Sequence, residues 1–216
     1  MTLPPATATE KKRARLILKR LRKAYPDAHC ELDFKTPFQL LIATILSAQC
    51  TDKSVNAATP DLFAKYPDAK RLAKAPQADV ERLIKSIGLY RNKSKNIIVT
   101  AQMLMKLHGG EVPSAMQDLV ELAGVGRKTA NVVRFNGFGL PGLPVDTHVL
   151  RVGKRLGLFK SENPVEVEAI LGQVVPPKDW GWCSHWLIWH GRRVCGARNP
   201  NCEVCVLQDI CPSSSV

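Results

Sequence analysis

Four cysteines stand close together near the C-terminal end of this 216-residue chain, in the stretch CGARNPNCEVCVLQDIC. Six, two and five residues separate them, and they are Cys195, Cys202, Cys205 and Cys211. The stretch carries few helix signals, because glycine, proline and asparagine interrupt it. A short segment of this kind needs cross-links to hold one conformation, so the chemistry of these thiols constrains the fold around them.

The cysteines favour a bound metal over disulfides. Their total of seven is odd, which argues against a complete disulfide framework. The N-terminus, MTLPPATATEKKRARLILKRLRK, lacks the apolar core of a signal peptide, so we expect a cytoplasmic chain with reduced thiols. Four thiolates suit either one tetrahedral zinc ion or a [4Fe–4S] cube, and their spacing alone leaves both open. The other cysteines, Cys30, Cys50 and Cys183, are expected to be small buried residues.

The charge of the chain indicates a polyanionic partner. Thirty-one Lys and Arg stand against nineteen Asp and Glu, which gives a formal net charge of +12. Such an excess is typical of proteins that bind nucleic acid or an anionic membrane surface. The longest apolar stretch, LLIATIL at residues 40–46, is far shorter than the ~20 residues of a membrane-spanning helix. We therefore expect nucleic acid and no membrane.

Helical periodicity runs through most of the chain, and no stretch alternates with a period of two, so we predict an all-α fold. The first helix should begin at Glu10. Further helices are expected at about residues 36–48, 52–66, 78–87, 92–107, 114–121, 127–137, 147–157, 164–173 and 183–190. The segment GFGLPGLP at residues 137–144 should interrupt the helices and form a hinge between two helical lobes.

Two local patterns refine these helices. Ser114 is followed three residues later by Gln117, which predicts a capping box at the helix start. Trp182, Trp186 and Trp189 recur at helical spacing, which is more typical of core packing than of a base-stacking platform. We expect them to pack against the N-terminal helix.

Residues 121–130 read ELAGVGRKTA and predict two helices joined by a tight turn. The glycines of Gly124-Val125-Gly126 allow positive φ and a close approach to a partner. The N–H groups that begin the next helix, at Arg127, suit a phosphate oxygen and would hold a DNA backbone without reading its sequence. An ordinary helix–turn–helix corner is the alternative, but the basic GxGRK continuation favours phosphate binding.

Lys128 follows in the first helical turn. The positive end of the helix dipole and the neighbouring Arg127 both favour a neutral amine. Such an amine is a nucleophile that forms a Schiff base with a sugar aldehyde carbon. On the residues alone, one more phosphate-binding lysine is the simpler interpretation.

Several motifs together resemble bacterial endonuclease III, a family of helix–hairpin–helix DNA glycosylases with AP lyase activity. They are GVGRKTA, VDTHV and the C-x6-C-x2-C-x5-C array, with LIATILSAQCTDKSVN, IGLYRNKSKNII and HWLIWHGRRVC in the family's order. The resemblance implies a six-helix barrel domain with the hairpin at residues 30–140. An iron–sulfur cluster domain would combine residues 1–29 and 141–216, with the active-site cleft between the two domains.

The resemblance also implies chemistry. The enzyme would remove oxidised pyrimidines from double-stranded DNA, acting on a damaged base or an abasic site, as a bacterial, nucleoid-associated monomer. Lys128 matches the family's catalytic lysine and Asp146 its catalytic aspartate, although Asp146 precedes a helical run and also suits an N-cap. The four clustered cysteines would hold a [4Fe–4S] cluster with a structural role. Ala123 departs from the family, which commonly has proline before the hairpin.

Further residues are implied to contact DNA. Gln49 resembles a plug that pairs with the orphan base, and Leu89 resembles a wedge. The alternatives are a polar helix terminus and a core leucine. Asp52 and His148 are candidates for the base pocket, or else capping and structural residues. The arginines expected to meet phosphates, or else to be merely solvated, are Arg192, Arg193 and Arg198.

Two other functions stay open on the residues. One is a non-catalytic, metal-stabilised DNA-binding module that uses the hairpin alone. The other is adenine removal by a MutY-like glycosylase, a family that usually has serine at the position of Lys128 and carries an extra C-terminal domain. Lys128 together with Asp146 favours the bifunctional enzyme, and so does a chain that ends soon after Cys211.

Overall fold

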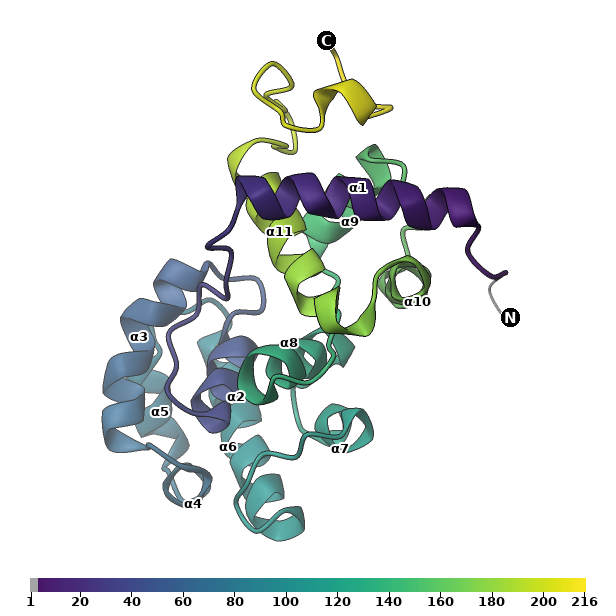
Figure 1. Ribbon diagram of the computed structural model, residues 1–216. Helices are drawn as coiled ribbons and strands as arrows, with labels where there is room; N and C mark the ends of the chain where they lie inside the picture. Colours follow the sequence, from purple (N-terminus) through teal and green to yellow (C-terminus); the bar gives the residue numbers. More distant parts are fainter. Residues whose placement is uncertain (1–3) are drawn as a thin grey trace. The chain divides into compact units, whose positions relative to one another are not determined.

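The computed structural model describes residues 4–216 (Figure 1). Within these residues the regular secondary structure is helical, apart from one isolated β-bridge between Cys195 and Pro200. The predicted all-α fold is therefore confirmed. The helices are α1 (Ala8–Ala24), α2 (Pro37–Leu46), α3 (Asp52–Lys65), α4 (Ala69–Leu72), α5 (Gln77–Leu83), α6 (Tyr90–Leu107), α7 (Met116–Glu121), α8 (Arg127–Phe138), α9 (Thr147–Arg155), α10 (Pro164–Val174) and α11 (Trp180–Arg193), with short 3₁₀ helices η1 (Pro177–Asp179) and η2 (Gln208–Ile210).

The chain packs into two compact units. One unit is the continuous segment Glu31–Leu140. The other combines the N-terminal segment, up to Cys30, with Pro141–Val216. The second boundary falls inside the glycine- and proline-rich segment 137–144, where the periodicity of the sequence also breaks.

Helix α2 is the centre of the unit Glu31–Leu140. Thr36 caps its first turn by accepting a hydrogen bond from the Gln39 backbone N–H, and Pro37 supplies a preset φ at the first helical position. Nearly all of its remaining side chains are buried, and α2 packs against α3, α6 and α8. A helix that is apolar all round belongs in a core, which explains the run LLIATIL. No helix in residues 4–216 has the length and apolar character needed to span a bilayer.

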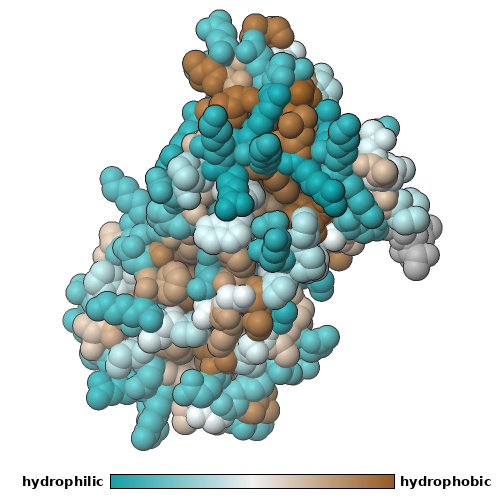
Figure 2. All heavy atoms as spheres, viewed as in Figure 1, coloured by the Kyte–Doolittle hydropathy of each residue, from teal (hydrophilic) through white to brown (hydrophobic). Residues whose placement is uncertain are grey.

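Helix α1 organises the other unit. Its N-terminus carries a capping box between Thr7 and Glu10, and its buried face packs against α10 and α11. Trp186 and Trp189 are each 6% exposed in this core, as predicted. The prediction was wrong for Trp182, which is 41% exposed because it lies in the first turn of α11, at the end of the apolar stripe. Hydrophilic side chains gather around α1 on the face shown in Figure 2, which has the same view as Figure 1.

Two local expectations need correction. The capping box at Ser114 is absent, because α7 begins later, with Ala115 at the N-cap and no side-chain cap hydrogen bond. The Ser114 carbonyl instead accepts a hydrogen bond from Arg134 of α8. Helix α4 was not predicted, since four residues are too few to show a helical period.

Candidate functional site

The glycine turn between α7 and α8 is held in place by its neighbours. Gly124 has φ +74°, and a Cβ there would lie 3.1 Å from the Asn96 side-chain nitrogen. Both the backbone conformation and the space therefore require glycine. Val125 is buried, and the hydroxyl of Thr100 on α6 donates a 2.6 Å hydrogen bond to the Ala123 carbonyl. The turn predicted from the sequence is thus present and anchored to α6.

The N-terminus of α8 is open. Gly126 is its N-cap, without a side-chain cap hydrogen bond, and a Cβ at Gly126 would meet nothing within 4 Å. Arg127 and Lys128 follow in the first turn, and both are exposed. A helix start without a side-chain cap presents N–H donors and the positive end of its dipole, which together suit an anion. The Lys128 amine belongs to this same exposed turn.

Asp146 is the N-cap of α9, and its Oδ1 accepts a 2.8 Å hydrogen bond from the Val149 backbone N–H. The capping role considered from the sequence is therefore present. The residue is half-exposed, so capping leaves the carboxylate in contact with solvent. Lys128 belongs to the unit Glu31–Leu140 and Asp146 to the other unit.

Gln49 and Leu89 share an unusual backbone conformation. Within residues 4–216 they are the only non-glycine residues with positive φ, at 54° and 59°. Left-handed conformations of this kind cost about 1–2 kcal/mol for a residue with a Cβ. Gln49 is exposed in the turn between α2 and α3, and Leu89 is 59% exposed at the N-cap of α6. The core-leucine alternative for Leu89 is wrong.

The two pocket candidates lie at helix starts. Asp52 is the first residue of α3 and is half-exposed, while capping falls to Thr51, whose hydroxyl accepts from the Ser54 N–H at 3.2 Å. His148 is half-buried in α9, and its Nδ1 lies 3.1 Å from an Arg151 guanidinium nitrogen. His148 therefore has a structural contact in addition to its candidate role.

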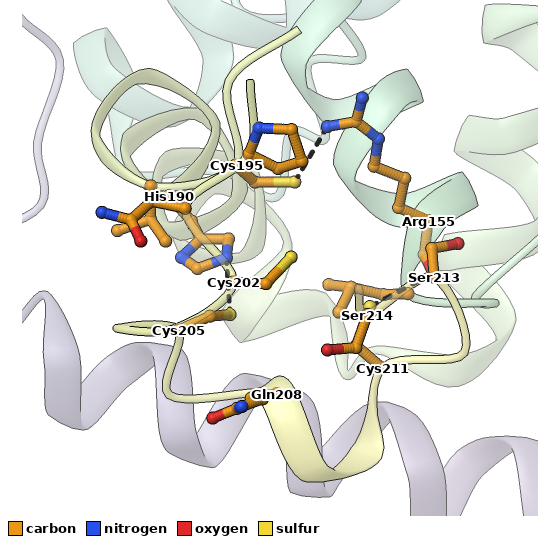
Figure 3. A pocket seen from close by; sticks show the side chains of 13 residues that line it. Arg155, His190, Cys195, Cys202, Cys205, Gln208, Cys211, Ser213 and Ser214 are labelled. Atoms are coloured by element: carbon orange, nitrogen blue, oxygen red, sulfur yellow. Dashed lines mark hydrogen bonds between the residues drawn. The ribbon is translucent and has the colours of Figure 1, made fainter. Parts of the chain in front are cut away.

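The clustered cysteines line one cavity in the C-terminal segment (Figure 3). All are half-buried, and they are Cys195, Cys202, Cys205 and Cys211. A zinc ion needs sulfurs converging at about 2.3 Å from one point. Across residues 4–216, no three His, Cys, Asp or Glu side chains are arranged to hold a single metal ion. Four thiols that line one cavity can supply the four thiolates that hold a [4Fe–4S] cube.

Arginines from other helices hold this segment in place. Arg155 of α9 donates to the Gly196 carbonyl at 2.7 Å and to the Ala197 carbonyl at 2.8 Å, and one nitrogen lies 3.3 Å from the Cys195 sulfur. Arg13 of α1 donates at 2.8 Å to the carbonyls of Leu156 and Ile210. Sequence reasoning missed both arginines, because bonds to backbone carbonyls leave no spacing signature.

His190 of α11 is a further neighbour of the cysteines. Its Nε2 lies 3.5 Å from the Cys205 sulfur, and its Nδ1 lies 2.9 Å from the Tyr25 hydroxyl oxygen. Burial lowers the pKa of His190 to about 4, so the ring is neutral at pH 7. Burial raises the pKa of the Cys205 thiol, so its thiolate form depends on a bound cluster. As a cluster ligand Cys205 would have no proton to donate, so Nε2 would carry the proton and the Tyr25 hydroxyl would donate to Nδ1.

The arginines expected to bind phosphate, Arg192, Arg193 and Arg198, are all exposed. The Arg193 guanidinium carbon lies 3.8 Å from the centroid of the Trp189 ring, so this side chain has an aromatic partner. Burial raises the pKa of the Cys183 thiol to about 12, as suits an inert core residue. Cys30 and Cys50 are only half-buried, so the prediction that they are buried residues was wrong for these two.

Comparison with known proteins identifies two family regions. Residues 42–177 match the HhH-GPD superfamily of base excision DNA repair proteins. Residues 195–211 match the iron-sulfur binding domain of endonuclease III, and this match starts and ends at the outermost of the clustered cysteines.

Whole-chain relatives give the same result. The chain is 50% identical to endonuclease III of Synechocystis sp. over 208 residues, which cover 96% of this chain and 95% of the relative. It is 48% identical to endonuclease III of Escherichia coli K12 over 195 residues, with 90% and 92% covered.

Solved structures agree at the level of the fold. A non-covalent endonuclease III–DNA complex has a TM-score of 0.90 and 46% identity, and covers 94% of this chain and 95% of the other. A trapped endonuclease III–DNA covalent intermediate, in an estranged-adenine complex, has the same TM-score and identity, with 94% and 96% covered. Family, relatives and fold together show that this chain belongs to the endonuclease III family, as a base excision repair DNA glycosylase and AP lyase with a [4Fe–4S] cluster.

Proposed function

We propose that this enzyme removes oxidised pyrimidines from double-stranded DNA and cleaves the resulting abasic site through a Schiff base on Lys128. The observation that carries the proposal is the exposed Lys128 in the open first turn of α8, directly after the glycine turn. The N–H groups of that turn hold a DNA phosphate, which brings a sugar within reach of the amine.

The reaction begins with proton loss from the Lys128 ammonium, and Asp146 accepts that proton. The neutral amine attacks C1′ of the damaged nucleotide, the bond from C1′ to the base breaks, and the base leaves with the bonding electrons. The C1′–O4′ bond then opens: O4′ leaves with the bonding electrons and takes one proton from the attacking nitrogen, which gives the protonated imine. Loss of a proton from C2′ expels the 3′ phosphate from C3′, and the strand is nicked. Asp146 passes the proton that it took from Lys128 to the departing base, and the restored carboxylate stabilises the positive charge on the sugar.

The damaged nucleotide must first leave the base stack, at a cost of a few kcal/mol. Gln49 fills the vacated space and pairs with the orphan base, and Leu89 wedges between bases. Two observations support these roles: both side chains are exposed, and both residues hold a strained φ, a state that clusters at functional sites. Asp52 and His148 line the base pocket.

The remaining partners follow from charge. Arg192, Arg193 and Arg198 bind phosphates beside the cysteine segment, which makes binding strongly salt-dependent. The cluster, held by the cysteines of residues 195–211, has a structural role. The enzyme works as a monomer on DNA of the bacterial nucleoid.

Borohydride trapping tests the central step, because reduction of the imine links enzyme to DNA permanently. The parent enzyme should cross-link to duplexes that carry oxidised thymine or a bare abasic site. Lys128→Ala should lose cross-linking to both by about 100-fold or more. Lys106→Ala, another exposed lysine of the same unit, should cross-link as the parent does.

Three outcomes would contradict the proposal. A folded Lys128→Ala enzyme that cross-links like the parent would remove Lys128 from the chemistry. Release of adenine opposite oxidised guanine, with oxidised thymine left untouched, would favour the MutY-like alternative. Salt-dependent binding with no base release and no nicking would indicate a passive DNA-binding module.

A further inference from the structure

A lysine is buried in the unit that carries the glycine turn. Lys93 lies in the first turn of α6 and is only 5% exposed. Its Nζ donates a 2.8 Å hydrogen bond to the Leu46 carbonyl. Burial lowers its pKa, while the nearby Cys50 opposes that shift. Lysines are almost never fully buried without a partner, so this side chain needs a specific explanation.

The acceptor of this hydrogen bond is the end of another helix. Leu46 is the last residue of α2, and the last carbonyls of a helix lack the amide partners found in its interior. They also form the negative end of the helix dipole, which favours a cation. The Lys93 side chain therefore caps the C-terminus of α2 from α6, across more than forty residues of sequence.

The side chain and the backbone of Lys93 each form a hydrogen bond at the edge of a turn that holds a residue with positive φ. The chain leaves α2 after Leu46 and reaches Gln49, with φ 54°, three residues later. Leu89, with φ 59°, is the N-cap of α6, and its carbonyl accepts a 3.0 Å hydrogen bond from the Lys93 backbone N–H. The backbone of Lys93 thus closes the turn behind Leu89, while its side chain closes the helix end before Gln49.

We infer that Lys93 is a positioning residue that locks the turns of Gln49 and Leu89 into the conformations they need to enter a duplex together. The inference rests on the roles proposed above for Gln49 and Leu89. A residue with a Cβ keeps a left-handed backbone only where the surrounding structure holds it there. The Lys93 amine, which bonds α2 from the first turn of α6, supplies that constraint to both turns. Without it, the turns relax in the free enzyme, and the duplex must reorder them at every encounter.

Three variants test this role: Lys93→Met, Gln49→Ala and the double variant. Methionine keeps an apolar stem of similar length but has neither charge nor donor. Base release is measured in single turnovers on duplexes with oxidised thymine opposite adenine or opposite guanine. Cross-linking to a single-stranded abasic site is measured in parallel, because that substrate has no orphan base to pair.

Lys93→Met should slow base release from the duplex by about 10-fold or more, as expected for loss of a hydrogen bond from a charged donor. The ratio of rates opposite adenine and guanine should move toward that of Gln49→Ala. Cross-linking to single strands should stay within twofold of the parent. In the Gln49→Ala background, Lys93→Met should slow base release by less than it does in the parent, because only its effect through Leu89 is left to lose.

Tyr66→Phe is the matched control. It removes a 2.6 Å hydrogen bond to Asp79 in the same unit, so it tests whether lost stability alone produces the effect. It should leave the adenine-to-guanine ratio unchanged. Should Lys93→Met fail to fold, Lys93→Gln, which is shorter and uncharged, takes its place and is judged by the same ratios.

The outcomes separate the inference from the proposed function. A normal duplex rate in Lys93→Met, beside a slow Gln49→Ala, would overturn the inference and leave the role of Gln49 standing. Equal slowing on duplex and single strand would also overturn it, since it would indicate general damage to the fold. A Gln49→Ala enzyme with parental rates and an unchanged ratio would remove the proposed role of Gln49, and the inference with it.

Discussion

Asp146 has one observed role, at a helix start, and one proposed role, in the reaction. Its Oδ1 caps α9 through the Val149 N–H, and we propose that the same group takes the proton of Lys128. Capping needs only an accepting oxygen, whereas proton transfer and stabilisation of a cationic sugar need the negative charge. The two functions therefore respond differently to substitution.

Asp146→Asn should separate them. The asparagine oxygen still accepts from Val149, so the free energy of unfolding should change by less than about 0.5 kcal/mol. Base release should fall by about 100-fold or more, because the charge and the proton acceptor are gone. Chemical denaturation and single-turnover kinetics measure the two quantities.

Asp146→Ala is the companion variant, and it should lose about 1 kcal/mol of stability as well as the activity. Parental base release by the folded asparagine variant would show that Asp146 serves the helix alone.

Helix α9 links the capping aspartate to the cysteine segment. Asp146 stands at its N-terminus, and Arg155 at its last turn bonds the carbonyls of Gly196 and Ala197. These carbonyls lie in the loop between the first two clustered cysteines, Cys195 and Cys202. The arginine therefore fixes the path of a loop that has little secondary structure of its own.

Arg155→Met should loosen that loop while keeping the alkyl stem in place. We expect the visible absorbance of the cluster to be lost about 10-fold faster in the presence of a chelator, since several hydrogen bonds disappear. Lys154→Met is the neighbouring control, because Lys154 pairs with Glu162 instead of the loop. Equal rates of loss in both variants would contradict this role.

Some of these elements were predictable from the sequence and some were not. The turn at Gly124 was predictable, because the need for a positive φ is a local property of the chain. The burial of Lys93 was not predictable. In the sequence Lys93 stands between Arg91 and Lys95, as on an exposed basic helix face, and only the packing of α2 buries it. The role of Arg155 could not be predicted either, because its hydrogen-bond acceptors are backbone carbonyls, which every residue has.

At the scale of the whole molecule, stability depends on pH through buried histidine. His185 of α11 is 7% exposed, and burial, aided by nearby His29, lowers its pKa to about 4. The unfolded chain keeps an ordinary histidine pKa near 6.5 and therefore binds the proton first as the pH falls. His185 thus stabilises the fold fully above about pH 6.5 and loses that contribution as the pH falls through 4.

The free energy of unfolding should therefore decrease between pH 6.5 and pH 4, with His185 responsible for up to about 3 kcal/mol. His185→Gln should make that part of the curve shallower, because glutamine does not titrate, while His190, whose pKa burial also lowers to about 4, keeps the rest of the slope. Denaturation of both proteins across the pH range, with the cluster intact, provides the comparison. Parallel curves would show that His185 does not titrate in this window.

The unit built from both ends of the chain imposes an order on biosynthesis. Helix α1 leaves the ribosome first, yet the helices that cover its apolar face, α10 and α11, are translated last. Ala14, Ile17, Leu18 and Leu21 thus stay uncovered while the whole of Glu31–Leu140 is synthesised. The four proposed cluster ligands are all present only once Cys211 has been translated, so on this assignment the cluster is completed after α1 to α11 have been made.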